Sequence, residues 1–317
     1  MLRHSIARLS SRLSIFLAQL GPHARAVGLM AIVALLWSLA GVVSRYLSPT
    51  LMAEGKFEIV FWRSAFAALF VFVMLARQGF DLRRWLRDAG VPGLVSACCW
   101  AGMFTAYMIA LAYTSVARVL VLSALGPLAT AVLSRLLFST LIPTRTWLAL
   151  MVASVGLTWM VAHAGASGAR PAGHDVTGML IAALVPLCSA INLVTLQRWG
   201  KQFDFVPTVM LGATLSAGFA LVCMGGFHAN LLDVFLLAVL GVFQLGLPCM
   251  LMVLAAQRLS ATEVALLGLL ETVLGPLWAW LGAGEVPTSA TLTGGALVVA
   301  ALVANEAAAR RRPLETS

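Results

Sequence analysis

One carboxylate and one guanidinium stand out within the long apolar stretches of this sequence. Glu271 lies near the middle of the stretch 262–281, and Arg63 lies within the stretch 57–76. A charge inside hydrocarbon costs about 2.5–3.5 kcal/mol on insertion scales, so such residues are candidates for function by default. A carboxylate at this depth can bind an amine or carry a proton, whereas a guanidinium can hold a carboxylate or phosphate through its fork of donors.

Each of the two residues also has a structural interpretation. A carboxyl group between helices can serve as a hydrogen-bonded link. Arg63 can pair with Glu58 or extend to the lipid headgroups. The sequence leaves the functional and the structural interpretation open for both residues.

Further polar and aromatic side chains lie near mid-depth in other apolar stretches, and together they form a candidate substrate site. Its residues are Trp37, Ser38, Tyr107, Asn192, Gln244, Glu271 and Trp278, with Arg63 as a candidate anion contact. We find no catalytic residue set, no metal-ligand spacing, no Walker A motif, no H-E-x-x-H and no G-x-S-x-G. We therefore expect no metal, no cofactor and no ATP coupling within the chain.

Composition identifies the elements that must position these residues. The chain has 317 residues, of which 61% are hydrophobic and 10% are charged, and its mean hydropathy is +0.96. An ordinary soluble domain carries about 25% charged residues, so this chain cannot cover a water-exposed surface. The composition excludes a soluble enzyme, a disulfide scaffold and a disordered chain, and it predicts an all-α polytopic membrane protein.

Ten apolar segments approach the roughly 20 residues that a membrane-spanning helix needs. They are 27–47, 57–76, 90–112, 117–138, 146–163, 177–197, 207–225, 232–255, 262–281 and 290–308. Since lipid offers no hydrogen-bond partner to the backbone, we expect each to be a helix. Residues 1–26 have an amphipathic, arginine-rich pattern that favours an interfacial or disordered segment, with a mitochondrial transit peptide as the alternative.

Basic residues indicate the orientation of these helices. The loops on the side of the N-terminus hold fifteen lysines and arginines, including the basic tail 309–317, whereas the opposite loops hold three. Short cytoplasmic loops collect such residues, so we expect both termini in the cytoplasm. The basic loops account for the net charge of +9, so we expect no nucleic-acid partner.

An internal repeat divides the chain into two halves of five helices, 27–163 and 177–308. At an offset of 145, Ser115 matches Ser260, and after one extra residue the turn Pro143-Thr144 matches Pro287-Thr288. Because five is odd, the second half is inserted upside down. Two inverted repeats are typical of alternating-access transporters that bind their substrate near the midplane.

Several short motifs resemble one known family, the drug/metabolite transporter superfamily of the EamA-like type. The motifs are Leu36-Trp37-Ser38, Phe61-Trp62-Arg63-Ser64, Leu111–Ala117, Leu270-Glu271-Thr272, Gly284-Glu285-Val286-Pro287-Thr288 and Gly294-Gly295-Ala296-Leu297. The resemblance spans about residues 27–308. It implies a bacterial inner-membrane secondary transporter that exports a small polar metabolite, such as an amino acid, as a monomer or homodimer in the bilayer.

The sequence leaves the coupling partner, the functional class and the substrate open. A proton is a second candidate partner, because a buried carboxyl group can carry one. An intramembrane enzyme or a channel is the alternative to a transporter, although the enzyme lacks recognisable chemistry and the channel needs a symmetric ring of pore residues. The substrate, the direction of transport and the coupling ion are not specified by any motif.

Overall fold

The computed structural model describes residues 21–310 apart from 114–118, 120, 121, 124, 140, 163–174 and 284–287. The described residues form helices and no strand. Eight helical segments among them are long and apolar enough to cross a membrane, which confirms the expected all-helical membrane protein. The amphipathic pattern of residues 1–20, the motif at 284–287 and the end of the basic tail at 311–317 lie outside the described residues.

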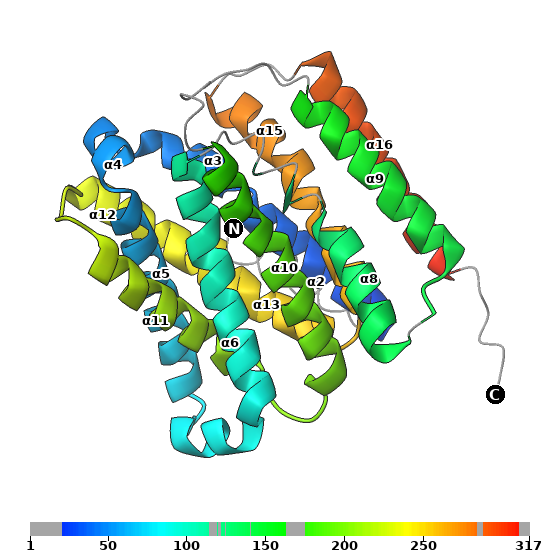
Figure 1. The fold of residues 1–317 in the computed structure, drawn as a ribbon, viewed down its shortest axis with the longest axis horizontal. Helices are drawn as coiled ribbons and strands as arrows, with labels where there is room; N and C mark the ends of the chain where they lie inside the picture. Colours follow the sequence, from blue (N-terminus) through cyan, green and yellow to red (C-terminus); the bar gives the residue numbers. More distant parts are fainter. Residues whose placement is uncertain are drawn as a thin grey trace, which may run out of the picture.

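Most helix bounds agree with the predicted apolar segments (Figure 1), but α8 covers only 126–138 of the predicted segment 117–138, and neither α8 nor α9 is among the eight candidate spans. The first half contains α2 (Pro22–Trp37), α3 (Ala40–Val43), η1 (Ser44–Tyr46), α4 (Pro49–Glu54), α5 (Lys56–Ala76), α6 (Leu82–Tyr113), α8 (Gly126–Phe138) and α9 (Thr144–Ala162). The second half contains α10 (Asp175–Trp199), α11 (Val206–Cys223), α12 (Leu231–Val239), η2 (Leu240–Gly246), α13 (Leu247–Ala256), α14 (Ala261–Gly268), α15 (Leu270–Ala283) and α16 (Ser289–Arg310).

Local sequence explains where several helices begin. The side chains of Asn230 and Asp233 form a reciprocal capping box at the start of α12, and Ser260 and Glu263 form another at the start of α14. Each box satisfies backbone N–H groups that the first turn of a helix leaves without partners. Asp233 also accepts hydrogen bonds from the backbone N–H (2.8 Å) and hydroxyl (2.7 Å) of Ser48, so it ties α12 to the segment before α4.

Four of the helices expected to be continuous are interrupted. The predicted helix 117–138 has a turn at Leu125, directly before α8. The predicted helix 27–47 breaks after Trp37, the predicted helix 262–281 breaks at Leu269, and the predicted helix 232–255 contains the π-helix η2. The last interruption has a cause in the sequence, because Pro248 lacks an N–H and its ring collides with the carbonyl of Gln244 one turn earlier. A wider π turn relieves that collision, and such turns occur frequently at functional sites.

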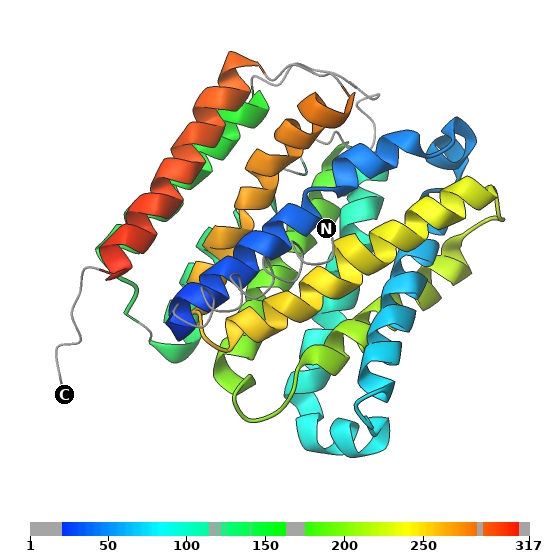
Figure 2. The same cartoon turned by 180° about the vertical axis from the view of Figure 1, so that it is seen from behind.

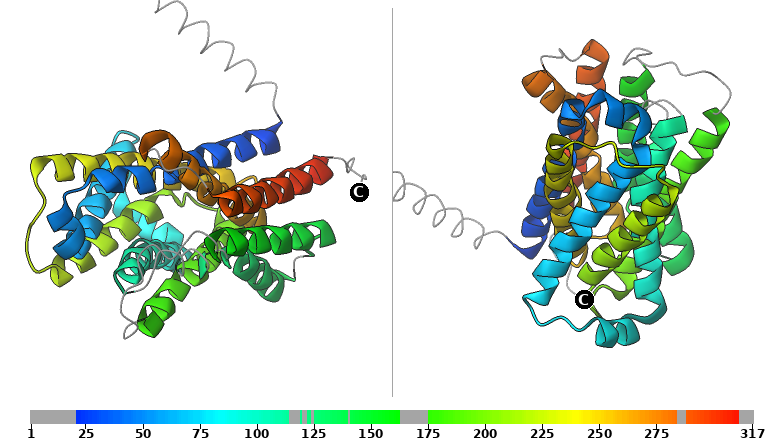
Figure 3. Two further views of the ribbon diagram at one scale, coloured as in Figure 1. Left: turned by 90° about the horizontal axis from the view of Figure 1, so that it is seen from above. Right: turned by 90° about the vertical axis from the view of Figure 1, so that its left-hand side faces the viewer.

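The helices form two layers, as the view from above in Figure 3 shows. In one layer α5 packs on η2, α13 packs on α2, and α2 packs on α14 and α15. In the other layer α11 packs on α6, α6 on α10, and α10 on α8. Figure 2 shows the first layer from its outer side, with the blue α2 beside the yellow α12 and α13. Each layer therefore combines helices from both halves of the sequence.

Two helix pairs join the layers at their ends. At one end α5 packs against α11, and at the other α9 packs against α16 along most of their length (Figure 1). The second contact depends on glycine, because a Cβ atom at Gly294 would lie 2.4 Å from the carbonyl oxygen of Gly156. Small residues at such a crossing let two backbones approach closely in a membrane. The two pairs thus connect the layers at opposite ends.

Candidate functional site

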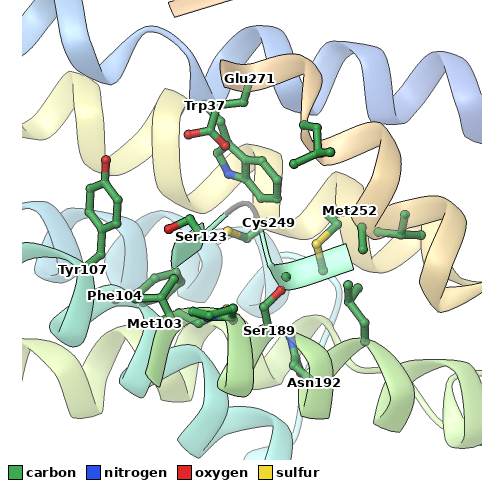
Figure 4. Close-up of a pocket in the computed structure, with 18 of the residues that line it drawn as sticks. Trp37, Met103, Phe104, Tyr107, Ser123, Ser189, Asn192, Cys249, Met252 and Glu271 are labelled. Atoms are coloured by element: carbon green, nitrogen blue, oxygen red, sulfur yellow. The ribbon is translucent and has the colours of Figure 1, made fainter. Parts of the chain in front are cut away.

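A cavity of about 260 Å³ lies between the two layers. Its walls come from both halves of the chain, with α2, α5, α6 and α8 on the one hand and α10, η2, α13, α14 and α15 on the other. Figure 4 shows polar and aromatic side chains that point into it from several helices. The polar or aromatic residues on the wall are Trp37, Arg63, Trp100, Phe104, Tyr107, Ser123, Ser189, Asn192, Gln244, Glu271 and Thr272.

Arg63 reaches this wall because α5 and η2 approach each other closely. A Cβ atom at Gly241 would lie 2.6 Å from the carbonyl oxygen of Arg63, so only glycine allows this approach. The side chain of Arg63 is 5% exposed, and its Nε atom has no hydrogen-bond partner. Its guanidinium therefore faces the cavity with donor capacity to spare.

Glu58 does not balance the charge of Arg63. Its carboxylate accepts hydrogen bonds from the backbone N–H groups of His228 (2.6 Å) and Ala229 (3.0 Å) and from the indole of Trp62 (3.2 Å). These contacts fasten the loop before α12 to the start of α5. The ion pair of Arg63 with Glu58 that the sequence left open is therefore not formed.

Glu271 lies in the first turn of α15, directly after the break at Leu269. Figure 4 shows its carboxylate beside the ring of Trp37 at one side of the cavity. Glu271 and Arg63 both line the cavity, and among the described contacts no ion pair joins the two side chains. The cavity thus presents an anion and a cation that a bound molecule can contact separately.

A second polar group lies at the other side of the cavity. The hydroxyl of Ser96 donates a hydrogen bond of 2.6 Å to Oδ1 of Asn192, which fixes the amide of a side chain that is 1% exposed. The Nδ2 atom of Asn192 is left without a partner. In Figure 4 Asn192 and Ser189 project from α10 into the cavity. This side offers uncharged donors and acceptors.

Unpartnered polar atoms are concentrated on the cavity wall. The atoms are Arg63 Nε, Trp100 Nε1, Ser123 Oγ, Asn192 Nδ2 and Gln244 Oε1. A buried donor or acceptor without a hydrogen bond costs about 1–3 kcal/mol. Five such atoms around one space indicate that the cavity is built to receive a polar molecule.

Six of the eight residues singled out from the sequence lie on this wall: Trp37, Arg63, Tyr107, Asn192, Gln244 and Glu271. The other two, Ser38 and Trp278, do not line the cavity. The indole N–H of Trp278 donates a hydrogen bond of 2.8 Å to Ser38, which connects α15 to the end of α2. The hydroxyl of Ser38 in turn donates a hydrogen bond of 2.7 Å to the carbonyl oxygen of Leu35. Both polar groups therefore have protein partners and link two broken helices, which the sequence pattern could not distinguish from a binding role.

The apolar part of the wall could not be recognised from residue types. Met103, Phe104, Cys249 and Met252 line the cavity, yet their residue types are those of ordinary helix packing. Ser189 carried a weak signal, because it occupies in the second half the place that Ser38 holds in the first. Among the described residues the wall has no set of histidine, cysteine or carboxylate ligands for a metal.

Comparison with known proteins identifies related chains. The model of the EamA-like transporter family matches residues 24–162 and 176–305. The pseudopaline exporter CntI of Pseudomonas aeruginosa (strain UCBPP-PA14) is 27% identical over 269 residues, which cover 84% of this chain and 91% of the exporter. The protein of the same name from strain PAO1 matches equally well, at 27% identity.

Two further comparisons cover less of the chain or share less sequence identity with it. The uncharacterized transporter YdfC of Bacillus subtilis is 28% identical over 192 residues, or 58% of this chain and 60% of YdfC. A solved structure titled "Crystal structure of protein" superimposes with a TM-score of 0.73 at 19% identity, and the match covers 92% of this chain and 99% of that one. At this identity the likeness shows the fold alone.

Proposed function

Because this chain belongs to the EamA-like transporter family, we propose that it is a secondary transporter that exports a small polar metabolite by alternating access. Family membership makes it a multi-span bacterial membrane transporter rather than an enzyme. The observation that carries the proposal is the cavity between the layers, because five unpartnered polar atoms surround it. Exporters among its relatives favour the outward direction.

The cavity favours a zwitterion such as an amino acid. The guanidinium of Arg63 can hold a carboxylate through two hydrogen bonds, and the carboxylate of Glu271 can accept hydrogen bonds from an ammonium group. The volume of about 260 Å³ lies just below the range of about 300–1,000 Å³ that is typical of drug-sized ligands. A small metabolite fits this space, with its side chain against Trp100 and Phe104.

Alternating access requires two states related by the inverted repeat, and the packing order supports that repeat. From one end of the first layer the order is α5, α12 to α13, α2, and α14 to α15. Each of these helices has a counterpart in the other half: α11 for α5, α6 for α12 to α13, α10 for α2, and α8 for α14 to α15. The counterparts, taken in the same order, give the order of the second layer. We propose ten membrane helices, with α9 as the fifth and with α8 and the residues before it as the fourth.

The orientation of these helices is also a proposal. The basic residues between the end of α5 and the first turns of α6, together with those at and after the end of α16, favour the cytoplasmic side for both termini in the bacterial inner membrane. The cavity would then open alternately to the cytoplasm and to the periplasm. The protein would act as a monomer or homodimer, since one chain supplies every wall of the cavity.

A comparison of exported metabolites tests the proposed function. We expect a compound with both an amine and a carboxylate to decline in the medium of a deletion strain and to rise in the medium of an overexpression strain. Overexpression of Asn192→Leu, which replaces the amide on the wall by a side chain of similar size, should raise that compound much less. Media that do not differ, or that differ only in compounds lacking both charged groups, would contradict the proposal.

A further inference from the structure

The cavity wall carries one cation and one anion among its described residues. Arg63 comes from α5 and Glu271 from α15. The other groups that face them are uncharged in their ordinary states, and they include Tyr107 of α6, Gln244 of η2 and Cys249 of α13. The remaining wall, from α2, α8, α10 and α14, contributes no acid, lysine, arginine or histidine. With Arg63 protonated and Glu271 ionised, the fixed charges on the described wall of the cavity sum to zero.

This balance matters because a net charge at mid-depth is costly. A guanidinium stays protonated in proteins, so the positive charge of Arg63 has to be compensated at every stage of transport. Of the described groups on the wall, Glu271 alone can do this. Glu58, the acid nearest in sequence, is occupied by backbone N–H groups of the loop before α12.

Arg63 and Glu271 both face the cavity, and no ion pair between them is formed among the described residues, so a solute in the cavity can contact each of them. A solute with one positive and one negative group can separate the pair and replace its attraction by two contacts. The sum of charges in the cavity then stays at zero. A solute with a net charge would leave one charge without compensation inside the membrane, at a cost of the order described for intramembrane charges.

We propose that Arg63 and Glu271 balance each other's charge, so that the cavity selects solutes without net charge and carries them without moving charge or protons. This inference rests on the proposed transport function. It makes Glu271 an amine contact and counter-ion rather than a proton carrier. It also makes transport follow the gradient of the metabolite itself.

The proposal predicts a change of specificity when one charge is removed. Arg63→Gln leaves the cavity with the negative charge of Glu271, so a cationic solute restores the balance. Glu271→Gln leaves the positive charge of Arg63, so an anionic solute restores it. Arg63→Lys is the matched control, because it changes the geometry of the donor but keeps the charge.

The test uses the full-length protein in proteoliposomes with three labelled probes: leucine (neutral), glutamate (net negative) and lysine (net positive). We expect the wild type to take up leucine, at a rate that an imposed membrane potential or pH gradient leaves unchanged and without a current on a solid-supported membrane. Arg63→Gln should prefer lysine to leucine by at least about tenfold, and Glu271→Gln should prefer glutamate by a similar factor, as loss of a charge-assisted hydrogen bond implies. Arg63→Lys should keep the preference for leucine.

Two results would overturn the inference while the proposed function stands. One is leucine uptake by the wild type that generates a current or is driven by a proton gradient. The other is wild-type preference for glutamate or lysine over leucine. The wild-type measurement needs no variant, so it decides the matter even if a variant does not fold. Absence of uptake for all three probes would instead overturn transport of amino acids, and the inference with it.

Discussion

Filling the cavity from Gly268 should stop transport without weakening the fold. Gly268 is the last residue of α14 and lies on the cavity wall. A Cβ atom placed there meets nothing closer than the ring of Trp37 at 3.9 Å, which is an ordinary van der Waals contact. A larger side chain at this position therefore extends into open space inside the cavity.

The expected loss of transport follows from the volume that the new side chain takes up in the cavity. The four carbon atoms of Gly268→Leu displace roughly 100 Å³, if each takes about the 30 Å³ of one water molecule, out of a cavity of about 260 Å³. A solute that fills the cavity then no longer fits, so we expect transport to fall by at least about tenfold, which corresponds to about 1.4 kcal/mol. Replacing glycine in a helix also favours folding by about 0.5–1 kcal/mol, so stability should be unchanged or slightly higher.

Thermal unfolding of the purified protein and uptake into proteoliposomes measure the two effects separately. Gly275→Leu in α15 is the matched control, because a Cβ atom there meets nothing within 4 Å and Gly275 does not line the cavity. It should keep both stability and transport. Normal transport by Gly268→Leu, or an equal loss in Gly275→Leu, would refute the assignment of this cavity to the transport path.

Three further predictions concern the frame around the cavity. Gly294→Ala should lower the thermal unfolding midpoint, because its Cβ atom would lie 2.4 Å from the carbonyl oxygen of Gly156 and overpacking costs about 1–3 kcal/mol; an unchanged midpoint would show that α9 and α16 can separate freely. Asp233→Ala removes the acceptor of three hydrogen bonds and should destabilise the protein by at least about 1–3 kcal/mol, as measured by thermal unfolding. A variant as stable as the wild type would contradict the role of Asp233 in fastening α12. Reporter fusions should place Ser317 in the cytoplasm and the loop 164–173 in the periplasm, since the basic residues favour that orientation; a cytoplasmic signal from the loop would exclude an inverted repeat.

Hydropathy located eight of the ten predicted spans among the described residues, whereas the predicted spans 117–138 and 146–163 have no counterpart among the candidate membrane helices. The predicted segment 57–76 corresponds to α5 (Lys56–Ala76), and the predicted segment 207–225 corresponds to α11 (Val206–Cys223). Long apolar runs leave the chain no alternative to helix in lipid, so their limits follow from the breakers between them. The breaks after Trp37 and at Leu269 were not predicted. The break after Trp37 has no proline or glycine beside it, although the hydroxyl of Ser38 donates a hydrogen bond of 2.7 Å back to the carbonyl oxygen of Leu35, a contact that often bends helices.

The candidate site, too, could be predicted from the sequence only in part. Arg63 and Glu271 could be recognised because an intramembrane charge is costly and therefore rare. Their position on one cavity wall could not be derived, since it depends on how α5 and α15 rotate against their neighbours. Ser38 and Trp278 have the residue types of a binding site but hydrogen-bond to each other. Residue type identifies a polar group that needs a partner, and only the packing shows whether the partner is protein or solute.

The most direct test of the central claim is counterflow of the exported zwitterion by the wild type and by Glu271→Gln in proteoliposomes. We expect saturable exchange by the wild type. In Glu271→Gln we expect an apparent affinity for the zwitterion that is lower by about 10- to 150-fold, because one charge-assisted hydrogen bond worth about 1.5–3 kcal/mol is lost. Thermal unfolding would establish that the variant is folded. Exchange by folded Glu271→Gln with the affinity of the wild type would contradict the claim that the solute binds between Glu271 and Arg63.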